Sequence, residues 1–393
     1  MKKILVLNSG SSSLKYQLFN VDGDKYEVVA KGLAERIGID ASKVSIKRAD
    51  GTKKEVMVDL PTHNEALREV FNLLLDGVIK DLSEISAVGH RIVHGGEIFT
   101  GSVLVDEKVI QDIDELSTLA PLHNPAAVLG LRAVQNALPH VPQVTVFDTA
   151  FHQTMPKEAF LYGIPLNQYT DYKIRRYGAH GTSHRYVSEE IAKILGKNNR
   201  LIVCHLGNGA SLSAIKDGVC MDTSMGFTPL GGIIMGTRSG DMDPYIPLHI
   251  MKTQGLSVDE MNVFLNKKSG MFGLTGFADM RDVENLYLQG DAKAVDAMKT
   301  YVYTIVKFIG SYIAALGGVD AIAFTAGIGE NSPIIRKMVL ERLSYLGISV
   351  DEEANNRRGD IEEISTKGSK VRAFVIPTNE ELMIAKDTVA LTK

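Results

Sequence analysis

Two arginines lie where a small anionic ligand could reach them. Arg91 stands near the end of an apolar run that predicts a buried strand, and Arg238 lies in a segment rich in glycine, threonine and serine. A guanidinium group can hold a carboxylate or a phosphoryl group through two parallel hydrogen bonds. Arg91 could equally form a structural ion pair, whereas the glycine-rich surroundings of Arg238 favour contact with an anion.

An aspartate and a histidine add groups that could act on such a ligand. Asp148 directly follows the apolar run 141–147, and open α/β sheets bind ligands beyond the carboxyl ends of their strands. Asp148 could therefore act on a metal ion, water or substrate, or it could simply cap a following helix. His180 precedes a predicted helix among small residues, and a hydrogen-bonded loop histidine is the more frequent explanation of that pattern.

Two loops of small residues each join two predicted strands. Residues 9–13, of sequence SGSSS, are followed by Lys15, and residues 207–211, of sequence GNGAS, occupy the same place in a second hairpin. Such loops bring backbone N–H and hydroxyl donors together without bulk, as phosphate binding requires. The alternation after the first loop predicts a β-hairpin rather than a strand-to-helix turn. A tight turn alone would also explain either loop.

The elements that carry these loops occur twice along the chain. Strand, loop, strand, turn and strand are predicted over 3–30 and again over 200–223. We therefore predict a duplicated α/β fold with the phosphates of a nucleotide between the two loops. The predicted domains are residues 1–150 with 384–393, and residues 151–383.

Several helices and strands are predicted around these hairpins. Thr62 and Glu65 form a capping-box pattern that predicts a helix over 63–75. Ser183 is predicted to cap the helix that follows it. The apolar period over 291–316 predicts a long core helix, and residues 326–332 are predicted to be a loop between a strand and a helix.

Composition limits the function classes. The chain has 393 residues, of which 45% are hydrophobic and 23% charged, with a net charge of −4, as in a soluble globular protein of two or three domains. No basic cluster stands out, which argues against nucleic acid and membrane surfaces as partners. Cys204 and Cys220 lack metal or redox spacing, and no apolar run approaches the roughly 18 to 20 residues of a membrane span. A cytoplasmic protein is expected.

Seven motifs together resemble the acetate kinase family along essentially the whole chain. That family belongs to the sugar kinase, Hsp70 and actin superfamily, whose duplicated ribonuclease-H-like (actin-like ATPase) domains, with mixed sheets flanked by helices, agree with the repeat. The motifs are 8–15 (NSGSSSLK), 89–96 (GHRIVHGG), 147–152 (FDTAFH), 180–184 (HGTSH), 205–211 (HLGNGAS), 327–331 (GIGEN) and 378–382 (TNEEL).

The resemblance implies reversible transfer of the ATP γ-phosphoryl group to acetate, giving acetyl phosphate and ADP by direct in-line transfer. It implies Mg²⁺, with Mn²⁺ as an alternative ion, and a homodimer. The second domain would carry most ATP contacts. By matching position, these would be Lys15, His205, Leu206, Gly207, Asn208, Gly209, Asp279, Met280, Arg281, Gly327, Ile328, Gly329, Glu330 and Asn331.

The same resemblance assigns the reacting groups. Asn8 and one of Glu380 and Glu381, with Glu380 preferred, would serve the metal. Arg91 would hold the substrate carboxylate, and Arg238 and His180 would contact the phosphoryl group. Asp148 matches the active-site aspartate of the family, and His123 a further histidine near the phosphoryl group. A carboxylate is already ionised at neutral pH, so the main difficulty is repulsion between anions.

The acyl pocket departs from a common pattern of the family. Val93, Leu122 and Pro229 match apolar pocket positions, but Ala179 stands where many relatives have phenylalanine. A smaller side chain enlarges the pocket, and one methylene is worth only about 1 to 3 kcal/mol of discrimination. We expect acetate as the main substrate with appreciable activity on propionate. A short-chain acyl kinase that prefers propionate is the alternative.

Two other functions fit the sequence less well. A kinase of the same fold that phosphorylates a hydroxyl would need a base and polar groups for its substrate, whereas the expected pocket is small and apolar around one arginine. An actin-like or Hsp70-like protein that uses ATP to change conformation would leave the two arginines and the histidine without a purpose.

Overall fold

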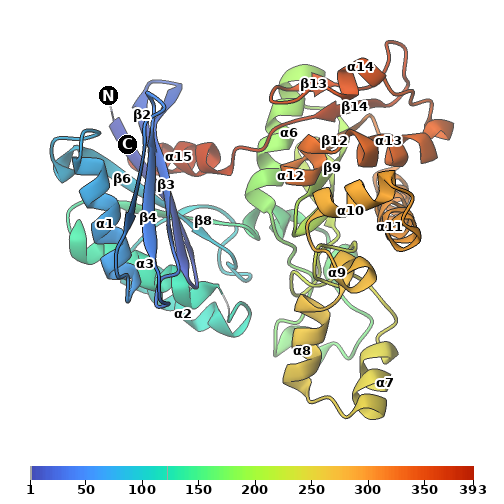
Figure 1. The fold of residues 1–393 in the computed structure, drawn as a ribbon, viewed down its shortest axis with the longest axis horizontal. Coiled ribbons are helices and arrows are strands. Elements are labelled where there is room, and N and C mark those ends of the chain that lie inside the picture. Colours follow the sequence, from blue (N-terminus) through green and yellow to red (C-terminus); the bar gives the residue numbers. More distant parts are fainter. Residues whose placement is uncertain (1, 122) are drawn as a thin grey trace. The chain divides into compact units, whose positions relative to one another are not determined.

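The structure, a computed structural model, describes residues 2–121 and 123–393. The chain forms two compact units, Met1–Phe151 with Asn379–Lys393, and His152–Thr378 (Figure 1). The predicted boundary between 383 and 384 is therefore corrected, because it falls inside α15 (Glu380–Leu391), which belongs wholly to the first unit.

The first unit contains an eight-stranded mixed sheet. β1 is parallel to β6, and β6 to β8, whereas β1 to β5 form an antiparallel series. The strands, in spatial order, are β5 (Lys53–Met57), β4 (Lys43–Arg48), β3 (Lys25–Glu35), β2 (Ser13–Asp22), β1 (Lys2–Gly10), β6 (Ile85–Ile92), β8 (Gln143–Phe147) and β7 (Val103–Leu104).

Helices cover both faces of this sheet. On one face α1 (His63–Leu75) and α3 (Asn124–Ala137) pack on Leu5 and Leu7, and on the other α15 packs on Ile4 and Val6. The middle of β1, residues 4–7, is entirely apolar because it is buried on both faces of the sheet. Thr62 and Glu65 form the predicted capping box of α1. The remaining short helices of this region are η1 (Leu82–Glu84), α2 (Glu107–Glu115), η2 (Leu116–Thr118) and η3 (Ala150–Thr154).

The second unit contains a six-stranded sheet with the same central order of strands. The order β3-β2-β1-β6-β8 of the first unit recurs as β11-β10-β9-β12-β14, which confirms the predicted duplicated fold. β12 is parallel to both β9 and β14. The strands are β9 (Arg200–Leu206), β10 (Ala210–Lys216), β11 (Val219–Thr223), β12 (Ala321–Thr325), β13 (Glu362–Glu363) and β14 (Arg372–Val375).

The predicted long helix is α11 (Ala292–Leu316), whose buried stripe joins the core over β10. Two local predictions are wrong. Residues 326–331 form the short helix α12 rather than a loop, and the N-cap of α6 is His180 rather than Ser183. The helices are α4 (Lys157–Phe160), α5 (Asn167–Thr170), α6 (Gly181–Leu195), α7 (Tyr245–Gln254), α8 (Val258–Lys267), α9 (Gly270–Thr275), α10 (Met280–Leu288), α11, α12 (Ala326–Asn331), α13 (Pro333–Arg342), η4 (Ser344–Leu346) and α14 (Glu352–Asn355).

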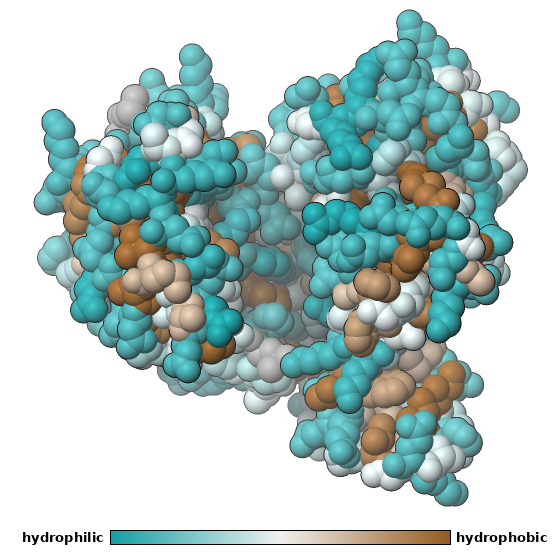
Figure 2. Space-filling model, in the orientation of Figure 1, coloured by the Kyte–Doolittle hydropathy of each residue, from teal (hydrophilic) through white to brown (hydrophobic). Residues whose placement is uncertain are grey.

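Among the residues that the structure describes, none of the helices combines the length and the apolar character that crossing a membrane requires. Apolar side chains are nevertheless exposed on part of the second unit, and Figure 2 shows them at the surface over α7 and α8. The exposed large apolar side chains of α7, α8 and α9 include Tyr245, Ile246, Leu248, Val258 and Phe272. We call these five residues the α7–α9 apolar patch.

Candidate functional site

In the first unit, a row of three polar side chains crosses neighbouring strands of the sheet. Asn8 on β1 is directly opposite Lys15 on β2 and Arg91 on β6. Residues in register on adjacent strands project to the same face. The fold thus brings together an amide, an ammonium and a guanidinium group from three of the predicted motifs.

Arg91 is held by Asp148 through two parallel hydrogen bonds. Arg91 Nε donates to Asp148 Oδ1 at 3.0 Å and Nη2 donates to Oδ2 at 2.6 Å. Asp148 is only 1% exposed, so its charge is compensated mainly by this pair. Within residues 2–121 and 123–393, Arg91 Nη1 makes no hydrogen bond, which leaves it for a ligand. The structural and the functional interpretations of Arg91 are therefore compatible.

Two adjacent glutamates at the start of α15 complete this group. Glu380 Oε2 lies 3.9 Å from Arg91 Nε, and Glu381 forms an ion pair with Lys15. Burial raises the pKa of Glu380 to about 7. The charge of Arg91 lowers this pKa only in part, and the charges of Asp148 and Glu381 raise it further. Burial also acts on Glu381, but the contact with Lys15 outweighs it and lowers the pKa of that carboxyl.

The donor set around β1 fits a hard cation such as Mg²⁺. Mg²⁺ is commonly bound by one or two carboxylates together with substrate phosphates and waters. Glu380 supplies a carboxylate whose ionised form lacks a full counter-charge, and Asn8 supplies an amide oxygen. The described residues contain no group of three or more His, Cys, Asp or Glu side chains suited to a metal ion. A cation here would therefore take its remaining ligands from elsewhere.

The other predicted residues of the first unit lie near the carboxyl end of β6. Val93 directly follows β6 and is half-buried, and His123 is the exposed residue before α3. The neighbouring His94 is buried, which lowers its pKa to about 4. Leu122 lies outside the described residues.

In the second unit, Arg238 and His180 both approach the predicted phosphate loop. A Cβ atom built on Gly209 would lie 3.4 Å from Arg238 Nη1 and 3.6 Å from His180 Nε2. Glycine thus leaves room for a ligand between the loop and these two groups. Residues 207–209 join β9 to β10 and residues 11–12 join β1 to β2, so the two predicted loops lie at corresponding turns, each shortened by the flanking strands.

Arg238 is a cation without a counter-charge. Its Nη1 donates to the Pro229 carbonyl at 3.1 Å and contacts Met235 Sδ at 3.7 Å, and it has no ion pair with any residue that the structure describes. Burial lowers its pKa from the usual value. A buried charge is costly without a partner, so this arrangement favours a bound anion beside Gly209.

His180 is held in an unusual conformation. Its φ of 59° places it in the left-handed region, which is rare outside glycine. Its Nδ1 lies 2.9 Å from Ser211 Oγ, and its ring stacks on that of His205 with centroids 4.1 Å apart. Backbone strain of this kind persists only where the surroundings determine it, and it is concentrated at functional sites.

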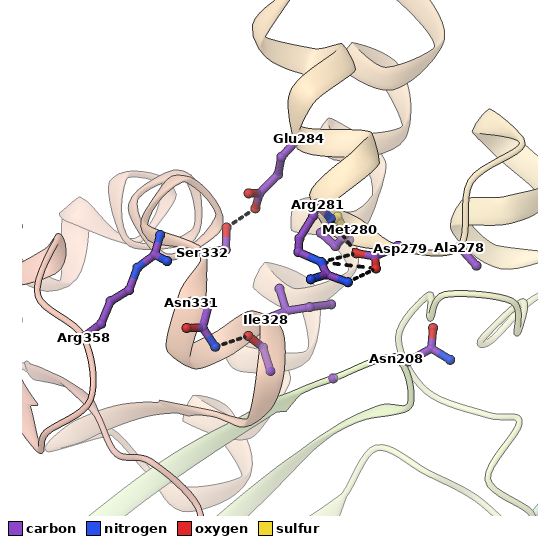
Figure 3. Close-up of a pocket in the computed structure, with 12 residues that line it drawn as sticks. Asn208, Ala278, Asp279, Met280, Arg281, Glu284, Ile328, Asn331, Ser332 and Arg358 are labelled. Atoms are coloured by element: carbon purple, nitrogen blue, oxygen red, sulfur yellow. Dashed lines mark hydrogen bonds and ion pairs between the residues drawn. The ribbon is translucent and has the colours of Figure 1, made fainter. Parts of the chain in front are cut away.

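A pocket of about 750 Å³ lies in the second unit (Figure 3). Asp279 caps α10 and holds Arg281 bidentately at 3.0 Å and 2.5 Å, and the hydrogen bonds from Arg281 lower the pKa of Asp279 to about 2. Eight of the residues that line the pocket were predicted as ATP contacts: Gly207, Asn208, Asp279, Met280, Arg281, Gly327, Ile328 and Asn331.

Four lining residues were missed: Ala278, Glu284, Ser332 and Arg358. Ser332 directly follows a predicted motif, and Arg358 belongs to an Arg-Arg-Gly turn, so local pattern could have indicated both. Glu284 is an ordinary helical position, and only the structure shows that it bonds Ser332 from α10 (Figure 3).

Five further predicted ATP residues of the second unit are not among the residues that line this pocket. The Leu206 side chain is fully buried in the core. Lys15, also predicted as an ATP contact, belongs to the first unit. His205 is 7% exposed and bonds Ser183 at 2.8 Å. Gly209 lies in the loop beside Arg238, and Gly329 packs on the Phe324 backbone. Glu330 instead accepts hydrogen bonds from the backbone N–H groups of Ala326 and Thr378, at 2.8 Å and 3.0 Å.

Comparison with known proteins gives a consistent family assignment. The profile of the Acetokinase family matches residues 3–386. An acetate kinase of Thermotoga maritima is 56% identical over 98% of both chains. A crystal structure of Porphyromonas gingivalis acetate kinase superposes with a TM-score of 0.96 at 44% identity, covering 100% of both chains. A propionate kinase from Francisella tularensis has a TM-score of 0.93, also at 44% identity and with 100% of both chains covered.

Proposed function

Because the chain belongs to the acetokinase family, we propose that it is an acetate kinase, which transfers the γ-phosphoryl group of ATP to acetate and forms acetyl phosphate and ADP. The observation that carries this proposal is the uncompensated Arg238 guanidinium beside Gly209 and His180. Among the described residues Arg238 has no anionic partner, and a phosphoryl group in transfer would supply the missing negative charge.

The residues of the first unit serve the acceptor. Acetate is ionised at neutral pH, so it can attack phosphorus without a general base. The Nη1 group of Arg91 binds its carboxylate, while Asp148 fixes the guanidinium plane through the other two nitrogens. Because Asp148 already fixes the Arg91 guanidinium, the side chain loses little conformational entropy when substrate binds. The bound carboxylate is thereby positioned for in-line attack on phosphorus.

The residues of the second unit serve the donor. The pocket that Asp279, Gly327 and Arg358 help to line takes the nucleoside part of ATP, and Asn208 and Gly209 present their backbone N–H groups to the phosphates. Arg238 and His180 donate to the equatorial oxygens, where charge develops as the bond to ADP breaks. The transfer is direct, so no phosphorylated side chain forms. Retention at a chiral phosphorus would contradict this part of the proposal.

Mg²⁺ would be held by Glu380 and Asn8. When bound, the ion neutralises phosphate charge and orients the oxygens of the triphosphate. The two protein groups fix where it sits, since Glu380 opens α15 and Asn8 lies opposite Arg91 in the sheet. Glu381 remains paired with Lys15 and keeps that ammonium in place.

Propionate is proposed as a second substrate. Ala179 precedes His180 and is 5% exposed, and its carbonyl accepts a hydrogen bond at 2.9 Å from His152 Nε2. The alanine presents one methyl group where the resemblance leads us to expect a phenyl ring. The extra methylene of propionate should therefore reduce its binding free energy only slightly relative to acetate. An enzyme that prefers propionate is the second candidate function.

We also propose that the protein forms a homodimer through the α7–α9 apolar patch. Leu248 is 58% exposed and Val258 73%, and patches of this kind on soluble proteins commonly mark association surfaces. The molar mass from light scattering tests this. Leu248→Glu should shift a dimer toward monomer, while Glu27→Lys, which is outside the patch, should not. A monomeric wild-type protein would contradict the assignment.

One assay tests the activity against its rivals. The protein is incubated with ATP, Mg²⁺ and acetate, and the acyl phosphate is trapped with hydroxylamine. Formation of acetohydroxamate supports a carboxylate kinase. Turnover of ATP that depends on a sugar or on glycerol would instead indicate a kinase for hydroxyl groups, and hydrolysis of ATP without any acceptor would indicate an ATPase that drives conformational change.

A further inference from the structure

Two buried polar groups, Ser211 and His184, are hydrogen-bonded in series behind His180 in the second unit. Ser211 Oγ lies 2.9 Å from His180 Nδ1 and 2.8 Å from His184 Nε2. Ser211 and His184 are both 0% exposed. We propose that Ser211 and His184 are positioning residues that keep the ring proton of His180 on Nε2, the nitrogen beside Gly209.

The argument starts at His184, the innermost group. Burial, reinforced by the charges of His152 and His205, lowers its pKa well below the usual value, so the ring is neutral and carries one proton. His184 Nδ1 has no hydrogen-bond partner among the residues described. A buried N–H without an acceptor is rarer in proteins than an acceptor without a donor. The proton therefore belongs on Nε2, from which it is donated to Ser211 Oγ.

The hydrogen bond that Ser211 accepts from His184 fixes the direction of the bond between Ser211 and His180. Having accepted from His184, it has one hydrogen to donate, and His180 Nδ1 is the acceptor at 2.9 Å. His180 Nδ1 is then the bare nitrogen of a neutral imidazole, and Nε2 carries the proton. Protonation of Nδ1 would leave the Ser211 hydroxyl accepting twice, with its own hydrogen unplaced.

The geometry gives this tautomer a purpose. His180 Nε2 lies 3.6 Å from a Cβ position on Gly209, and Arg238 Nη1 lies 3.4 Å from the same point. With the proton on Nε2, both groups are donors toward an anion at the loop. With the proton on Nδ1, the imidazole would present a lone pair to that anion and repel it.

The left-handed backbone at His180 supports the same interpretation. His180 is the N-cap of α6, yet its side chain does not cap the helix. His184 lies one turn further along the same helix, and its N–H bonds the His180 carbonyl at 3.0 Å. Both rings are within hydrogen-bond distance of the same serine hydroxyl. The catalytic benefit rests on the proposed function, but the tautomer does not.

The tautomer can be read directly from the wild-type enzyme. In the full chain labelled with ¹⁵N-histidine, two-bond and three-bond ¹H–¹⁵N correlations distinguish a protonated from a bare ring nitrogen. The His180 signals are assigned by their loss in His180→Gln. We expect Nε2 protonated and Nδ1 bare at pH 7.5. A ring protonated on Nδ1, or one exchanging between tautomers, would overturn the proposal whether or not the enzyme acts on acetate.

Variants test the relay itself. Ser211→Ala should give a mixture of His180 tautomers and lower kcat about tenfold or more, with the KM values for ATP and acetate changed less than about threefold. Ser213→Ala is the matched control, because Ser213 is equally buried on β10 and its hydroxyl bonds Thr223 instead. His184→Gln, which can keep a donor near the Nε2 position, should retain more activity than His184→Leu.

The outcomes separate the two proposals. An unchanged His180 spectrum in Ser211→Ala refutes the relay. A changed spectrum with an unchanged kcat removes the tautomer from catalysis while leaving the hydrogen-bond chain in place. The predicted tautomer in a protein that makes no acyl phosphate refutes the proposed function alone.

Discussion

Replacing Glu380 with glutamine should stabilise the protein at alkaline pH. The Glu380 pKa is about 7 in the folded chain against an ordinary value of 4.5, so the carboxyl binds its proton more tightly folded than unfolded. Stability is then lost as pH rises from about 4.5 toward about 7, because folding must hold an ionised buried carboxylate. Glutamine has the same shape and no charge, so it removes this cost.

The size of the effect follows from the two pKa values. The difference of about 2.5 corresponds to about 3 kcal/mol as an upper limit, at about 1.4 kcal/mol for each pKa unit. The Glu380 side chain is 19% exposed, and water screens part of its charge. We therefore expect Glu380→Gln to raise the free energy of unfolding by about 1 to 3 kcal/mol at pH 8 and by less than about 1 kcal/mol at pH 5.

The assay is urea unfolding of the metal-free protein at pH 5 and pH 8, followed by circular dichroism. The adjacent Glu381 is the control, with the opposite sign expected. Its lowered folded pKa means that ionisation stabilises the native state above the unfolded pKa, so Glu381→Gln should destabilise at pH 8. If both variants shift the urea midpoint in the same direction at pH 8, the electrostatic account of this cluster is wrong. Added Mg²⁺ should narrow the difference between wild type and Glu380→Gln, because a cation stabilises the ionised carboxylate.

The remaining predictions concern activity. Arg238→Ala should lower kcat about a thousandfold or more, while the dissociation constant of ATP from calorimetry changes little; an unchanged kcat would remove this residue from the site. Arg91→Lys keeps the charge but loses the paired N–H donors of the guanidinium group. It should lower kcat/KM for acetate at least about tenfold, with the KM for ATP as the internal control. Arg358→Ala should raise the KM for ATP several-fold with no change in the KM for acetate, and equal changes in both would argue against a nucleotide contact. For propionate, kcat/KM should lie within about a hundredfold of the acetate value and should fall in Ala179→Phe; negligible wild-type activity on propionate contradicts the pocket argument.

Much of the fold follows from local pattern in the sequence. β1 and β9 were predictable because strands buried on both faces are apolar throughout. The start of α1 was predictable because a capping box needs only Thr62 and Glu65, three residues apart. In these cases the signal and the structure that it predicts lie within a few residues of each other.

The predictions that failed depended on distant partners. Ser183 has the pattern of an N-cap, but its hydroxyl bonds His205 and Thr378, each at 2.8 Å, while the helix starts two residues earlier. Residues 326–331 are helical although their glycines indicate a loop, and Glu330 Oε1 accepts hydrogen bonds from the backbone N–H of Ala326 at the start of the helix and from that of the distant Thr378. Glu284, an ordinary position of α10 in the sequence, lines the pocket only because of the tertiary fold.

The position of α15 in the chain has a consequence for biosynthesis. This helix covers Ile4 and Val6 of the first unit, yet it follows the whole of residues 152–378. During translation the first sheet therefore emerges with one apolar face exposed, and this face stays exposed until the second unit has been synthesised. Glu380 and Glu381 arrive with the helix that closes it. The proposed metal site, which includes Glu380, can therefore form only after residues 152–378 have been synthesised.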